Sequence, residues 1–131
     1  MQSLLANKIK LVKYNSEMGR KFPKEVIPYL LKALKNADNV TKNDIENQLV
    51  KIGEAGIPVL VNELGTADGV ERATIAMVLI RLGYLSIEPL KNISQKDTSI
   101  DWIVKYIINE IEGSKTTLNY HYDSTKEILV G

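Results

Sequence analysis

Apolar residues between positions 57 and 82 recur at intervals of three and four, which is the spacing of one face of an α-helix. A first face is formed by Ile57, Leu60, Val61 and Leu64, and a second by Ile75, Leu79 and Leu82. The stretch GTADG at residues 65–69 separates them, and glycine at such a point ends a helix. The pattern predicts two helices joined by a short turn.

The same phrase occurs thirty residues earlier, since IPYLLKALKNADNV at residues 27–40 resembles IPVLVNELGTADGV at residues 57–70. Residues 27–56 aligned on residues 57–86 without a gap share ten identities, most of them apolar or at helix ends. These are Ile27/Ile57, Pro28/Pro58, Leu30/Leu60, Leu34/Leu64, Ala37/Ala67, Asp38/Asp68, Val40/Val70, Ile45/Ile75, Leu49/Leu79 and Gly53/Gly83. Such identities indicate a repeated supersecondary unit rather than a repeated active site.

A third, more divergent copy follows. Ile87 and Leu90 keep the offset of thirty, whereas beyond the turn an offset of 29 fits better. That offset aligns Val104, Ile108 and Ile111 with the second apolar face. We infer that one residue has been lost from the turn around residues 96–98.

The residues at the helix ends support the same boundaries. Pro58 suits a helix start, where a missing N–H costs nothing. Asp68 is expected to cap the following helix, with Glu71 completing a capping-box-like pair, and Gly83 to end it. In the first copy the corresponding residues are Thr41 and Asp44 at the start and Gly53 at the end.

Each helix pair has an apolar stripe that it cannot bury alone, and stacked copies bury these stripes against one another. The sequence therefore predicts an all-α protein, a right-handed α-solenoid of about three helix pairs in one domain. The expected parts are an amino-terminal capping helix at 1–23, repeats at 24–55, 56–85 and 86–113, and a tail at 114–131. The tail, with alternating apolar residues, is open to three interpretations: a short hairpin closing the stack, a partly ordered end, or a strand added to a partner.

The stretch IPVLVNELGTADGVERATIAMVLIRLG resembles HEAT-like repeats of the short bacterial type named after phycobilisome lyases, and residues 27–113 carry the pattern overall. The resemblance implies a ladder in which Asp68 and Arg72 bond to neighbouring repeats. Lys42 and Asp101 stand where the other arginines would be, which restricts the ladder to the central repeat. The family favours a small residue in the middle of the second helix, and this chain departs from that pattern with Val50, Ile80 and Asn109.

Composition fits an ordinary globular protein, with 44% hydrophobic and 25% charged residues and no cysteine. Lysines interrupt the apolar residues of the amino terminus, and no uninterrupted apolar run approaches the roughly 18 residues of a membrane span. We therefore expect a cytoplasmic protein that is not in a membrane.

Charge is unevenly distributed although the net value is +1. Residues 1–36 hold eight basic and two acidic side chains, whereas residues 37–131 hold nine basic and fourteen acidic ones. The basic segment is either a solvated cap, or a feature that steers a charged partner or supports weak end-to-end association of otherwise monomeric chains.

The chain carries no recognisable catalytic motif. His121 is the one histidine, and no phosphate-binding glycine loop or nucleophile elbow is present. We expect no enzyme activity, no metal and no cofactor.

The second helices of a solenoid usually line its concave binding side. Off the buried stripes lie three rows of residues, namely Asn43–Ala73–Trp102, Asn47–Met77–Tyr106 and Lys51–Arg81–Glu110. Because aromatic residues, Met and Arg are enriched in interface hot spots, we expect a partner-binding patch on this face. It comprises Asn47, Lys51, Met77, Arg81, Trp102 and Tyr106.

The other interpretation of Trp102 and Tyr106 is that they cover the open end of the last repeat. The expected function is a protein-binding scaffold. The alternatives are a nucleic-acid binder that uses the basic amino-terminal segment and, more remotely, the pigment lyase or chaperone that the family name suggests.

Overall fold

The computed structural model describes residues 22–113, which are helical throughout apart from short connections and contain no strand. The elements are η1 (Lys24–Val26), α2 (Ile27–Ala33), η2 (Leu34–Asn36), α3 (Asn39–Ile52), η3 (Gly53–Gly56), α4 (Ile57–Leu64), α5 (Gly69–Leu82), η4 (Gly83–Ser86), α6 (Ile87–Lys96), η5 (Thr98–Ile100) and a last helix over residues 101–113. The predicted all-α class is confirmed. The expected capping helix and the expected tail or hairpin fall on residues 1–21 and 114–131, outside the described residues.

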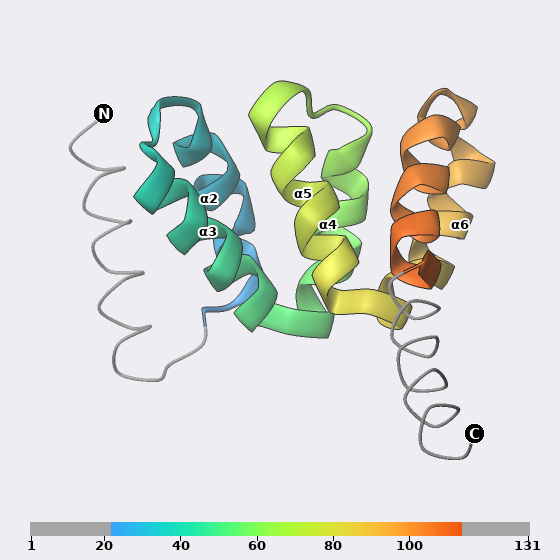
Figure 1. Ribbon diagram of the computed structural model, residues 1–131, viewed down its shortest axis with the longest axis horizontal. Coiled ribbons are helices and arrows are strands. Elements are labelled where there is room, and N and C mark those ends of the chain that lie inside the picture. The colour runs from blue at the N-terminus through green and yellow to red at the C-terminus, as the bar shows by residue number, and fades with distance from the viewer. Residues whose placement is uncertain (1–21, 114–131) are drawn as a thin grey trace, which may run out of the picture.

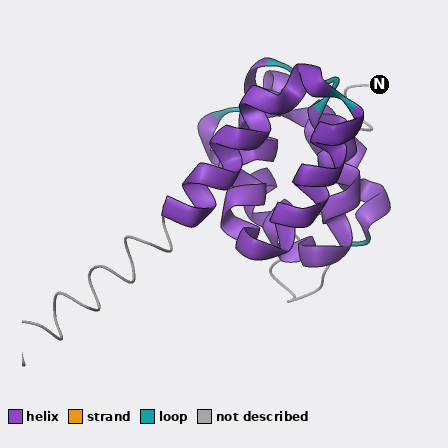
Figure 2. Cartoon of the chain, turned by 90° about the vertical axis from the view of Figure 1, so that its right-hand side faces the viewer, coloured by secondary structure: helices purple, strands orange, loops and turns teal. Residues whose placement is uncertain are grey.

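The helices stand side by side as three pairs, α2 with α3, α4 with α5, and α6 with residues 101–113 (Figure 1). The first helices form one layer and the second helices form the other, as the end view in Figure 2 also shows. Neighbouring pairs touch within each layer, since α3 contacts α5 and α4 contacts α6. Segments thirty residues apart in sequence thereby become neighbours in space.

The core lies between the layers and between neighbouring pairs. The face predicted for α4 is buried in full, with Ile57, Leu60, Val61 and Leu64 all at most 4% exposed. Ile75 and Leu79 of α5 are also fully buried, whereas Leu82 is half-buried at the end of that helix. These buried faces confirm the helical register read from the spacing.

Burial on the second helices is wider than one stripe. Val78 of α5 and Ile107 of the last helix are completely buried, although both lie off the predicted stripe. α5 packs against α3 and α4 at once, so more than one of its faces is covered. The three- and four-residue spacing identifies a single apolar face of a helix. Residues that are buried on a second face, such as these two, are therefore not predicted by it.

Both long second helices end at a glycine. Gly53 follows α3 with φ 77° and Gly83 follows α5 with φ 72°, a left-handed conformation that residues with a Cβ rarely adopt. The two predicted helix ends are confirmed. The connections η3 and η4 then lead directly into α4 and α6.

The predicted helix starts are correct in one detail and wrong in others. Pro58 lies in the first turn of α4, as expected. Asp38 rather than Thr41 caps α3, its Oδ1 accepting a hydrogen bond of 2.7 Å from the Thr41 N–H. Asp68 precedes α5 in extended backbone, but its side chain makes no capping hydrogen bond, so the expected Asp68–Glu71 cap does not form.

The turn of the third pair has its own hydrogen bonds. Asp97 Oδ1 accepts hydrogen bonds from both the N–H and the hydroxyl of Ser99, at 3.1 and 2.6 Å. The Ser94 hydroxyl donates to the Asp101 carboxylate, which links α6 to the start of the last helix. These hydrogen bonds lie in the turn at which the repeat offset changes from 30 to 29 residues.

Residues 69–96 are, by length and composition alone, apolar enough for a membrane span. In the structure this stretch is two helices, because α5 ends at Leu82 and the chain turns at Gly83 before α6 begins. Several side chains of α5 belong to the core. The stretch is therefore weak support for a membrane segment.

Candidate functional site

The outward-facing residues of α3, α5 and residues 101–113 form one surface, which we call the second-helix face. Its most conspicuous members are large apolar side chains that remain in contact with solvent. Met77 is 44% exposed, Tyr106 50% and Trp102 59%. Exposed apolar side chains gathered in one place commonly mark a binding surface.

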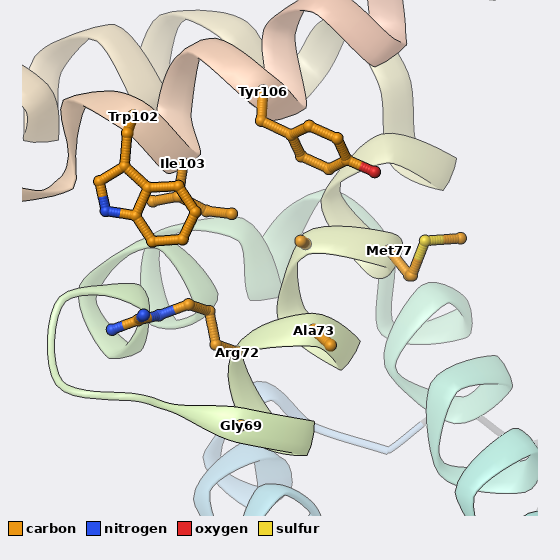
Figure 3. A pocket seen from close by; sticks show the side chains of 8 residues that line it. Gly69, Arg72, Ala73, Met77, Trp102, Ile103 and Tyr106 are labelled. Carbon is orange, nitrogen blue, oxygen red and sulfur yellow. The ribbon is translucent and has the colours of Figure 1, made fainter.

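A groove of about 280 Å³ lies between α5 and the last helix, and it is open to solvent (Figure 3). We call it the Trp102 groove and define it by its eight lining residues: Gly69, Arg72, Ala73, Ala76, Met77, Trp102, Ile103 and Tyr106. Small residues from α5 form much of one wall, so the aromatic rings opposite can approach that helix. Arg72 is the one charged residue in this lining.

Arg72 and Trp102 meet across the groove although they lie thirty residues apart. The Arg72 Cζ lies over the indole ring of Trp102, 5.5 Å from the ring centroid (Figure 3). A cation in this position is attracted by the negative face of the ring, by about 0.5–2 kcal/mol depending on how far water is excluded. The contact holds the arginine side chain against the groove wall.

The Nε of Arg72 is buried and has no hydrogen-bond acceptor among the described residues. An aromatic ring attracts a cation but supplies no lone pair in the plane of the guanidinium. A buried donor left without an acceptor costs about 1–3 kcal/mol. The Trp102 groove therefore contains a cation that is positioned by an aromatic ring, and its buried Nε has no acceptor among the described residues.

The other arginine of α5 has a different environment. Arg81 Nη1 donates to Glu46 Oε2 at 2.7 Å and to Asn47 Oδ1 at 2.9 Å, both on α3. We call these three residues the Arg81 junction. The guanidinium there is paired within the protein, which makes it a less available anchor for a partner than the sequence suggests.

The structure thus divides the six predicted patch residues into two groups. Met77, Trp102 and Tyr106 come together in the Trp102 groove. Asn47 and Arg81 lie at the Arg81 junction, and Lys51 is half-buried on α3 one turn beyond Asn47. Trp102 and Tyr106 face α5 across the groove, which does not favour the interpretation that they cover the open end of the last pair (Figure 3).

The sequence pattern did not predict three members of this surface, namely Arg72, Ile103 and Glu46. Arg72 was assigned to a ladder with Asp68, but its cation lies over Trp102 and the Asp68 side chain forms no cap. The offset of thirty would have aligned Arg72 with Trp102, whereas the offset of 29 preferred for the third copy aligned Ala73 with it. Glu46 carried no signal, because an acidic residue on an expected solvent face looks ordinary.

Residues 22–113 contain no group of three or more His, Asp or Glu side chains placed to hold a metal ion.

The same residues carry ten basic and thirteen acidic side chains, a net charge of −3. The basic excess on which the nucleic-acid alternative depended lies largely in residues 1–21. On the second-helix face Arg81 is neutralised by Glu46.

No protein-family model matches this chain, and neither the curated proteins nor the solved structures contain a match.

Proposed function

We propose that this chain is a HEAT-like, right-handed α-solenoid of about three helix pairs that acts as a non-catalytic scaffold. It binds a partner protein on the second-helix face, with the Trp102 groove at the centre of the contact. The observation that carries the proposal is the convergence of Met77, Trp102 and Tyr106, each between 44% and 59% exposed, on one groove.

The solenoid part of the proposal is supported by the thirty-residue repeat and by the order of the pairs. Each pair packs on the next through equivalent helices, α3 on α5 and α4 on α6. The glycines at equivalent positions 53 and 83 have nearly the same backbone conformation. Repetition of one unit with nearest-neighbour contacts is how solenoids bury their apolar stripes.

The binding part is supported by the chemistry of the groove. Met, Trp, Tyr and Arg are the residue types enriched at interface cores, and all four line this groove. Solvent-exposed aromatic rings of this size gain apolar burial when a partner covers them. The charged and amide groups of the Arg81 junction lie further along the same face and suit the polar rim of an interface.

The proposal is tested by comparing what variants of the full chain retain from a cell extract. The double variant Met77→Ala with Tyr106→Ala removes apolar area from the groove. Leu85→Ala is the matched control, because Leu85 is 51% exposed but lies on the connection η4, outside the groove. We expect proteins that wild type and Leu85→Ala both retain to be lost from the double variant. Identical retention by all three chains would contradict the proposal.

A further inference from the structure

We propose that the Trp102 groove recognises a peptide segment of the partner that carries an apolar side chain next to an acidic one, with the carboxylate bound by Arg72. This inference deepens the proposed scaffold function and rests on it. Two properties of the groove lead to it, one electrostatic and one apolar.

The electrostatic property is the contrast between the two arginines of α5. Arg81 already has two oxygen acceptors, from Glu46 and Asn47, at 2.7 and 2.9 Å. Arg72 has a ring at 5.5 Å and a buried Nε without an acceptor among the described residues. Because the Nε is buried, a ligand carboxylate would bind the terminal Nη atoms of Arg72, and a carboxylate is the group that matches the plane of a guanidinium best.

The apolar property is the rest of the lining. Besides Arg72, the groove presents Met77, Trp102, Ile103, Tyr106, two alanines and a glycine. A ligand carboxylate would be drawn to the one cation, while an adjacent aliphatic or aromatic side chain would fill the space between Met77 and the two rings. Water excluded by that side chain would strengthen the ion pair beside it.

The size of the groove favours a peptide over an enclosed small molecule. The groove is open to solvent rather than enclosed, and its volume of about 280 Å³ is at the small end of the roughly 300–1,000 Å³ of small-molecule sites. It has room for one or two side chains of a longer segment. The remainder of that segment can lie along the second-helix face towards Asn47 and Arg81, in the manner of a helix or strand laid in a groove.

The experiment begins with a random twelve-residue peptide library, selected on the full chain and counter-selected on Arg72→Gln. Trp102 is the single tryptophan of the sequence, so its fluorescence reports on this groove alone when the peptide itself lacks tryptophan. The strongest peptide is then synthesised in two forms, one with its acidic residue and one with the matching amide. Each form is titrated against wild type, Arg72→Gln, Arg72→Lys and Arg81→Gln.

We expect the selected peptides to share an acidic residue beside an apolar one. The amide form should bind wild type about tenfold or more weakly, since a hydrogen bond to a charged group is lost. Arg72→Gln should bind both forms alike, Arg72→Lys should recover only part of the difference, and Arg81→Gln should behave as wild type. If Arg72→Gln fails to fold, the comparison of acid with amide on wild type still decides the matter.

Several results would overturn the inference. If peptides bind, change Trp102 fluorescence and are weakened by Met77→Ala, but acid and amide forms bind equally, the scaffold proposal survives and the carboxylate assignment fails. If Trp102 fluorescence changes with chain concentration alone, the groove holds a second copy instead. If a single-stranded oligonucleotide at low salt changes it and no peptide does, the occupant is nucleic acid. If no peptide binds at all, the inference fails, and the scaffold proposal is then decided by the retention experiment described above.

Discussion

The two flanks of α5 are built from similar residues and end in opposite states. On the α3 side, Arg81 is bonded to Glu46 and Asn47, and the polar groups satisfy one another. On the side of residues 101–113, Arg72 lies over Trp102 and an open apolar groove remains. One flank is closed by its own hydrogen bonds, whereas the other keeps an open groove beside an arginine whose Nε has no acceptor among the described residues.

This difference shows that residue type alone does not tell which of two arginines on one helix is already hydrogen-bonded within the protein. Both arginines lie on the same helix and both suit a hot spot by composition. What separates them is the residue that the neighbouring pair places opposite, an acid and an amide in one case and an indole ring in the other. Substitutions in the core, at the helix starts, in the Arg81 junction and in the Trp102 groove can test this difference between the two flanks.

The largest effect should come from the core that holds both flanks in place. Leu79 is fully buried in α5, and Leu79→Ala should lower the free energy of unfolding by about 2–5 kcal/mol, because it removes buried methyl groups and leaves a cavity. Urea denaturation of the full chain measures this. Leu85→Ala is the matched control at 51% exposure and should cost about 0.5 kcal/mol or less. Equal losses for the two variants would mean that α5 is not packed as described.

The next effect concerns the start of the two second helices that form the closed flank. Asp38→Ala should destabilise the chain by about 1 kcal/mol, because the Asp38 side chain caps α3 through the Thr41 N–H. Asp68→Ala should have almost no effect, since that side chain makes no cap on α5. Thermal or urea unfolding of both variants checks the pair. A loss at Asp68 as large as at Asp38 would show that α5 is capped after all.

A smaller effect is expected at the closed flank itself. The Arg81–Glu46 pair is partly exposed, at 39% and 24% for its side chains, so its coupling energy should be about 0.2–1 kcal/mol. A double-mutant cycle with Arg81→Gln and Glu46→Gln isolates that energy. Repeating the cycle at high salt should reduce it, because salt screens exposed charges. A coupling of zero at low salt would remove the basis for calling this flank closed.

The smallest effect on stability should come from the open flank. Met77→Ala should change the free energy of unfolding by about 0.5 kcal/mol or less, because Met77 is 44% exposed, while it weakens partner binding. Melting curves beside those of Leu79→Ala provide the check. If Met77→Ala melts as low as Leu79→Ala, then Met77 belongs to the core and the Trp102 groove is not a free surface.

The sequence by itself determined the local features of this protein. The three- and four-residue spacing gave the helices and the buried face of α4, because a helix of 3.6 residues per turn can bury only residues with that spacing. Gly53 and Gly83 could be recognised as helix ends because a left-handed residue is a property of one position and its immediate neighbours. The exposure of Met77, Trp102 and Tyr106 followed from the same register.

Only the tertiary structure decided which distant residues meet. That Arg72 faces Trp102, that Arg81 is bonded to α3, and that Val78 and Ile107 are buried all depend on how one helix pair is rotated and shifted against the next. The family resemblance placed Arg72 in a ladder with Asp68, and neither the spacing nor the repeat offset could show that its cation lies over Trp102 of the next pair. Asp68 occupies the expected position before α5, but its side chain makes no capping hydrogen bond, which the spacing of residues could not show.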